Sequence, residues 1–148
     1  MEETKRNECI VPISIGELFD KFTILTIKRI RLQHDPRKME WLNGEWSALE
    51  YKVQLWLQRN PEGERIFNEL RNCNEVLWDI EENIRKKESE KCFDAEFIQL
   101  ARSVYMMNDR RAGIKKAINQ MYDSAIVEVK SYLELEENDE DPDIPSVA

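Results

Sequence analysis

The chain has 148 residues, which is enough for one domain with a hydrophobic core and too few to predict two domains. Its 41% hydrophobic and 35% charged residues, with only 4 glycines, favour long amphipathic helices and argue against a turn-rich β architecture. The net charge of -8 arises at the end of the chain, because Glu134 to Ala148 hold 7 of the 30 acids and no Lys or Arg. The remaining 23 acids and 22 bases make the body of the chain nearly neutral, which argues against nucleic-acid binding.

The first helix is predicted to begin at Ser14. The preceding apolar run, Cys9 to Ile13, contains Pro12 and suits an extended segment. Ser14 and Glu17 have the S-x-x-E spacing of a capping box, in which the serine hydroxyl accepts from the amide three residues later. From Ile15 to about Gln33 apolar side chains recur at helical spacing, and Arg29 interrupts the face that they form.

The starts of two further helices are each predicted by a capping residue followed by proline. Asp35 and Pro36 predict a helix that runs to about Arg59, and Asn60 and Pro61 predict one that runs to about Lys87. Beside their core stripes lie two features. The second helix has a weaker second apolar row, formed by Trp41, Ala48, Tyr51 and Leu55. The third helix has two polar groups that border the core, Asn74 and Glu81.

Asp94 predicts the start of a fourth helix, which we expect to continue to about Met121. Ala125 to Leu133 alternates well enough for a strand and is short enough for a last helical turn, so both interpretations stay open. The sequence therefore predicts an all-α fold, an antiparallel bundle of four long helices in one domain, residues 1–133. A short two-stranded pairing of Cys9 to Ile13 with Ala125 to Leu133 is a weaker expectation, and residues 134–148 are predicted to be an acidic, disordered tail.

The fourth predicted helix carries strong polar groups inside its apolar stripe. Within Leu100 to Asn119 the stripe recurs with steps of three and four, and Arg111 falls in the middle of it. Asn108 and Lys115 lie on the neighbouring row, at the border of the expected core. A charged group in such a place needs a partner, because an unpaired buried charge costs several kcal/mol.

Three segments form an ordered set of motifs. They read V-P-I-S-I-G-E-L-F-D-K-F-T-I-L-x-I-K at Val11 to Lys28, L-W-D-I-E-E-N-I-R at Leu77 to Arg85, and N-D-R-R-A-G-I-K-K-A-I-N at Asn108 to Asn119. Together they resemble a family of small uncharacterised helical proteins of bacteria and viruses, marked by the S-I-G-E-L-x-D-K opening and the late N-D-x-R-A-x-I-K-x-x-I-N motif. The resemblance spans most of the body of the chain and implies no activity, because none is assigned to that family.

The candidate site is a polar cluster contributed by three of the predicted helices. Its members combine positive charge with amide and acidic groups: Arg29, Arg111, Lys115, Asn108, Glu81 and Asn74. In one interpretation Glu81 pairs with Arg111 or Arg29 and the network fixes the register of the helices. In the other, positive charge stays uncompensated and binds a small carboxylate or phosphate, for which the arginine fork is suited.

Other catalytic and metal chemistry has weak support in the sequence. Glu17 with Asp20, and Asp79 with Glu82, have the i,i+3 spacing of metal-binding carboxylates, but we interpret them as solvated helix faces. One histidine, isolated glycines and three scattered cysteines provide no metal cluster, phosphate-binding loop or disulfide framework. We therefore expect no metal and no cofactor.

The sequence favours a non-enzymatic binding or assembly module that is cytoplasmic and does not enter a membrane. We expect a homo-oligomer, because several apolar side chains lie away from the core stripes: Trp41, Leu55, Ile24 and Ile27. A protein partner or a small anionic ligand is also compatible with the sequence, and nucleic acid is not expected. The alternative function is an enzyme or sensor that binds a small anion in the arginine-lined interior of the bundle.

Overall fold

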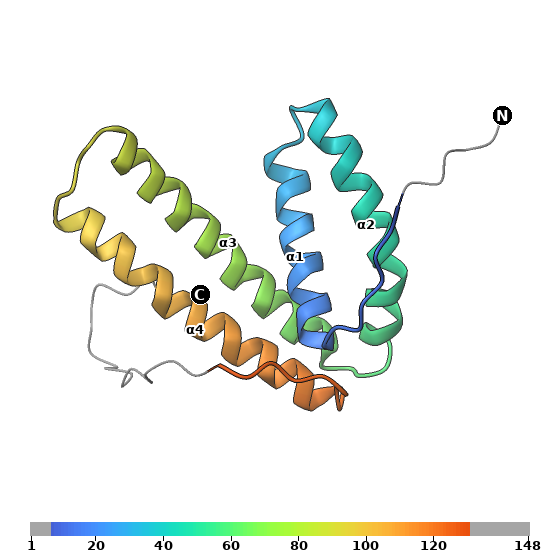
Figure 1. Ribbon diagram of the computed structural model, residues 1–148. Coiled ribbons are helices and arrows are strands. Elements are labelled where there is room, and N and C mark those ends of the chain that lie inside the picture. Colours follow the sequence, from blue (N-terminus) through green and yellow to red (C-terminus); the bar gives the residue numbers. More distant parts are fainter. Residues whose placement is uncertain (1–6, 131–148) are drawn as a thin grey trace.

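The computed structural model describes residues 7–130, and they contain four helices. These are α1 (Ile15–Arg31), α2 (Pro36–Leu57), α3 (Gly63–Ser89) and α4 (Ala95–Met121). Figure 1 shows two antiparallel hairpins, α1 with α2 and α3 with α4, which meet where α1 begins and α4 ends and diverge toward their turns. The predicted all-α bundle is thus confirmed, and α1 and α3 each contact all three other helices.

The predicted starts of α1, α2 and α4 are confirmed by their caps. The side chains of Ser14, Asp35 and Asp94 each accept hydrogen bonds from amides in the first turn of the helix that follows. The third helix begins later than expected, at Gly63, because the Asn60 side chain accepts from the amide two residues on and forms a turn instead of a cap.

The hydrophobic core lies where the two hairpins meet. Phe19 of α1, Leu70 of α3 and Ile118 of α4 are completely buried there. By contrast, α2 has only Val53 fully buried, since it packs mainly on α1 and lies at the outside of the bundle (Figure 1). The structure therefore consists of a tightly packed unit of three helices with α2 as an outer layer.

Close backbone contact joins the start of α1 to the end of α4. A Cβ atom added to Gly16 would lie 2.6 Å from the Lys115 carbonyl oxygen, so only glycine fits there. The Gly16 amide donates to Asn119 Oδ1 at 2.7 Å, and the Ile15 amide donates to Ser124 Oγ at 3.2 Å. These contacts place the first turns of α1 directly over α4.

The expected pairing of the two terminal segments is wrong for the residues that the structure describes. Neither Cys9 to Ile13 nor residues 125–130 form a strand. After Tyr122 the chain instead turns back along α4 (Figure 1). The Ser124 amide donates to the Asn119 carbonyl of α4, and the Ser124 hydroxyl accepts from the Ile15 amide of α1. Residues 131–133 of that segment and the predicted tail, 134–148, lie outside the described residues. No helix among residues 7–130 is long and apolar enough to cross a membrane.

Candidate functional site

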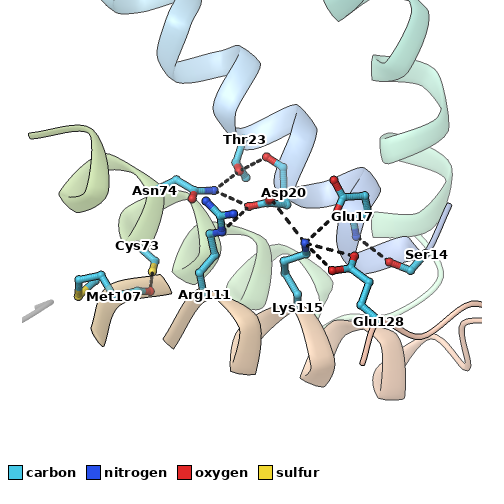
Figure 2. Close-up of polar contacts among 10 residues, drawn as sticks. All are labelled: Ser14, Glu17, Asp20, Thr23, Cys73, Asn74, Met107, Arg111, Lys115 and Glu128. Carbon is cyan, nitrogen blue, oxygen red and sulfur yellow. Dashed lines mark hydrogen bonds and ion pairs between the residues drawn. The ribbon is translucent and has the colours of Figure 1, made fainter. Parts of the chain in front are cut away.

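A cluster of polar side chains joins α1, α3 and α4 close to the contact at Gly16. We call it the Asp20 cluster, and Figure 2 shows its members: Glu17, Asp20 and Thr23 from α1, Asn74 from α3, Arg111 and Lys115 from α4, and Glu128 from the segment after α4. The cluster thus connects four parts of the chain that are distant in sequence.

Asp20 occupies the centre of the cluster and its side chain is only 5% exposed. Its carboxylate accepts a hydrogen bond of 2.9 Å from the Asn74 amide and lies 3.7 Å from Arg111 Nε and 3.8 Å from Lys115 Nζ. The same Asn74 amide donates to Thr23 Oγ1 at 2.8 Å. These partners offset the desolvation of a buried carboxylate, which is otherwise strongly unfavourable.

Lys115 is the second buried charge, with a side chain that is 10% exposed. Its Nζ atom lies 2.6 Å from Glu17 Oε2 and 3.2 Å from Glu128 Oε1, in addition to its contact with Asp20. Among the described residues, the cluster therefore contains three carboxylates and two cations. This excess of negative charge disfavours the binding of a further anion.

The structure brings together three of the six predicted site residues, namely Asn74, Arg111 and Lys115. Arg29 lies elsewhere, with its guanidinium carbon 4.1 Å from the centre of the Trp46 ring, and it donates to Asn43. Glu81 is exposed and lies 3.9 Å from Arg85 of its own helix. No hydrogen bond or ion pair of the described residues joins Asn108 to the Asp20 cluster.

The predicted pairing of Glu81 with Arg111 or Arg29 is therefore wrong. Glu81 lies two turns beyond Asn74 along α3, and its exposed side chain does not enter the interior where Asn74 and Arg111 meet Asp20. The acid that neutralises Arg111 comes from α1 instead, because α1 crosses close to both α3 and α4 near its own start.

The interpretation of Asp20 as part of a solvated face is also wrong, since the residue is buried. A signal was present in the sequence: Gly16, Asp20, Thr23 and Ile27 follow one another at steps of four, three and four, and all four are buried. Such a row has small or apolar neighbours on either side of the acid, unlike a solvated face. Glu128 carried no comparable signal, because it lies outside any helix.

The chain matches a protein family over residues 9–138, and this family is described as a family of unknown function, DUF6165. The chain belongs to this family. The match covers all four helices and every member of the Asp20 cluster. No curated protein and no solved structure matches the chain. Membership in DUF6165 therefore assigns no activity, and function has to be argued from the residues.

The charges of the Asp20 cluster shift the protonation of its members. Partial burial alone would raise the pKa of Glu17, but its hydrogen bond and ion pair with Lys115 outweigh burial and lower the pKa below 4.5. For Lys115, burial alone would lower the pKa, but the Glu17 hydrogen bond and the charge of Asp20 raise it above 10.5. Both groups are therefore charged at neutral pH.

These shifts predict how stability depends on pH. Because the folded pKa of Glu17 lies below 4.5, its contribution is present above that pH and is lost as the pH falls through the folded value. The contribution of Lys115 is present below pH 10.5 and is lost as the pH rises through its raised value. We expect urea unfolding between pH 7 and 3 to show a smaller acid-dependent loss in Glu17→Gln than in wild type. Equal losses in the two proteins would contradict the pairing.

The buried cysteine near the cluster is not an activated nucleophile. Cys73 is completely buried, and its thiol donates to the Met107 carbonyl at 3.6 Å (Figure 2). Burial raises the pKa of Cys73 to about 11, so the thiol is protonated at neutral pH. Residues 7–130 also contain no group of three or more His, Cys, Asp and Glu side chains that could hold a metal ion.

A second candidate site is the outward side of α2. Trp41, Tyr51 and Leu55 are 64%, 71% and 39% exposed there, and the small residues Gly44 and Ala48 are exposed between them. We call these five residues the α2 outer face. Ile24 and Ile27, which we expected on a surface, do not belong to one, because Ile27 is buried and Ile24 is half-buried.

Proposed function

We propose that this DUF6165 protein is a non-enzymatic assembly module that binds an amphipathic helix of another polypeptide chain on the α2 outer face. The observation that carries the proposal is the exposure of Trp41 and Tyr51 on one side of a helix. Exposed aromatic side chains of this size are the usual anchors of protein interfaces, where they contribute most of the binding energy.

The centre of the α2 outer face suits a helix rather than a loop or a small ligand. Nothing lies within 4 Å of a Cβ atom added to Gly44, and Ala48 follows one turn later on the same side. Small residues at these two positions let a second helix approach closely, while Trp41 and Tyr51 flank it at either end. A partner helix with apolar residues on one side would therefore fit.

The remainder of the protein acts as the support for this surface. Phe22 of α1 stacks on Trp46 of α2 at 5.4 Å between ring centres, and the Asp20 cluster fixes α1 to α3 and α4. The alternative function, binding of a small anion, has no support in the cluster because its acids outnumber its cations. The free thiols of Cys9, Cys73 and Cys92 fit the cytoplasm as the location of the module.

The proposal predicts that a photo-crosslinking amino acid at Tyr51 of the full-length protein, expressed in cells, reacts with a helix of another polypeptide chain. Ala48→Arg should reduce this product at least ~10-fold, because a long charged side chain keeps the partner helix away from α2. The matched control is Gly113→Arg on α4, where an added Cβ atom also meets nothing within 4 Å. Mass spectrometry of the crosslinked peptides identifies the partner segment.

The control variant should retain the crosslink at wild-type yield. Crosslinks confined to the same chain, or a product that Ala48→Arg leaves unchanged, would overturn the proposed function.

A further inference from the structure

Four of the five residues of the α2 outer face follow one another in a symmetric order. Large, small, small and large residues follow one another at Trp41, Gly44, Ala48 and Tyr51, with steps of three, four and three. The pattern is therefore the same in both directions along the helix, with its midpoint at Trp46. An interface between two copies related by a twofold axis requires such self-complementarity, because each copy contributes the same surface.

We infer that the partner of the α2 outer face is the α2 of a second copy of this chain, packed antiparallel with the twofold axis at the level of Trp46. The inference rests on the proposed function and names its partner. In this arrangement Gly44 lies opposite Ala48 of the second copy, and Trp41 lies level with Tyr51 of the second copy. The small pairs meet where the helices cross, and the aromatic residues cover the crossing on both sides.

The charged residues beside the α2 outer face favour the antiparallel direction. The α2 outer face has two flanks, one on either side of its midline. At about 100° per residue, Trp41 and Lys52 lie on one flank, and Tyr51 and Glu40 lie on the other. In an antiparallel pair, each flank faces the same flank of the second copy. Lys52 therefore comes level with the Trp41 ring of the second copy as a cation–π partner, and Glu40 comes level with the Tyr51 hydroxyl as an acceptor.

A parallel pair loses this complementarity. Opposite flanks then face each other at the same level, which places the Glu40 carboxylate against the negative face of the Trp41 ring of the second copy. Glu40 and Lys52 are both exposed and thus available for the antiparallel contacts. Glu45, which is nearer the axis, is already paired with Lys21 of its own chain at 3.1 Å, so its charge is compensated.

Disulfide crosslinking of the full-length chain tests the inference. The exposed or partly exposed thiols are first removed as Cys9→Ser and Cys92→Ser, and buried Cys73 is retained. A mixture of Gly44→Cys and Ala48→Cys proteins should form a mixed disulfide severalfold faster than either protein alone, since the two positions lie opposite each other. Tyr51→Cys should not crosslink to itself, because two copies of this position are ~15 Å apart along the antiparallel axis, beyond the reach of a disulfide.

Sedimentation equilibrium of the untreated protein supplies the second measurement. Dimers that give the mixed disulfide support the inference. Self-crosslinking of Tyr51→Cys without the mixed product would show a parallel pair and overturn the antiparallel arrangement, while the assembly function would stand. A monomer whose Tyr51 crosslinks to a different protein would overturn the second copy as partner, again without contradicting the proposed function. A monomer with no crosslink to any other chain would overturn both.

Discussion

Replacement of Asp20 by alanine is expected to lower the free energy of unfolding by about 3–5 kcal/mol, the range found when one member of a buried ion pair is removed. The carboxylate is the shared partner of Asn74, Arg111 and Lys115. Without it, two cations and an amide at the junction of α1, α3 and α4 lose a partner, and Lys115 is almost completely buried. Urea denaturation at neutral pH, followed by circular dichroism, measures the change.

The matched control for this substitution is Asp79→Ala. Asp79 also joins two helices through an arginine, Arg31 at 2.9 Å, but both side chains of this pair are more than a third exposed. Exposed pairs contribute at most about 1 kcal/mol, so the control should lose far less stability than Asp20→Ala. Equal losses would contradict the view that the Asp20 cluster holds the helices together. Asp20→Asn keeps the shape of the side chain and separates the loss of charge from the loss of volume.

The fold could be predicted from the sequence because its signals are local. Apolar stripes at helical spacing and the caps at Ser14, Asp35 and Asp94 define where the helices lie, and all three caps are confirmed. The start of the third helix was misplaced because Asn60 and Pro61 are equally compatible with a turn. The order of the helices is thus encoded locally, whereas their crossing positions are not.

Three of the seven members of the Asp20 cluster could be predicted from the sequence, because their signals are also local. Arg111, Lys115 and Asn74 each border a core stripe, which the sequence shows. Their partner depends on where α1 crosses α3 and α4, and this crossing is set by Gly16 at the other end of the chain from Lys115. Sequence spacing on α3 alone therefore pointed to Glu81, which is exposed and lies 3.9 Å from Arg85 of its own helix.

The α2 outer face was predicted in outline. Trp41, Ala48, Tyr51 and Leu55 form a second apolar row in the sequence, and all four are exposed in the structure. Gly44 was not part of the predicted row. Its place is evident from the structure, because a Cβ atom added to Gly44 would meet nothing within 4 Å. Which chain covers this face is a property of the assembly, so it stays a prediction that the crosslinking experiments address.

Gly16→Ala is expected to destabilise the protein, although alanine is the better helix former. The new Cβ atom would lie 2.6 Å from the Lys115 carbonyl oxygen and 2.9 Å from Asn119 Oδ1. Overpacking of this kind costs about 1–3 kcal/mol, because a backbone atom cannot move aside without shifting its helix. Separation of the helices also weakens the buried hydrogen bond from the Gly16 amide to Asn119, which contributes about 1 kcal/mol more. Thermal and urea denaturation measure the loss.

The matched control, Gly113→Ala on α4, should have the opposite sign. An added Cβ atom meets nothing within 4 Å at this exposed position, so the higher helix propensity of alanine should stabilise the protein by about 0.5–1 kcal/mol. The two variants also differ in their effect on the Asp20 cluster. Because Gly16→Ala moves Glu17 away from Lys115, the pKa of Glu17 measured by NMR should rise toward 4.5 in that variant and stay at the wild-type value in Gly113→Ala. An unchanged pKa in a destabilised Gly16→Ala protein would mean that the helix contact and the cluster are independent of each other.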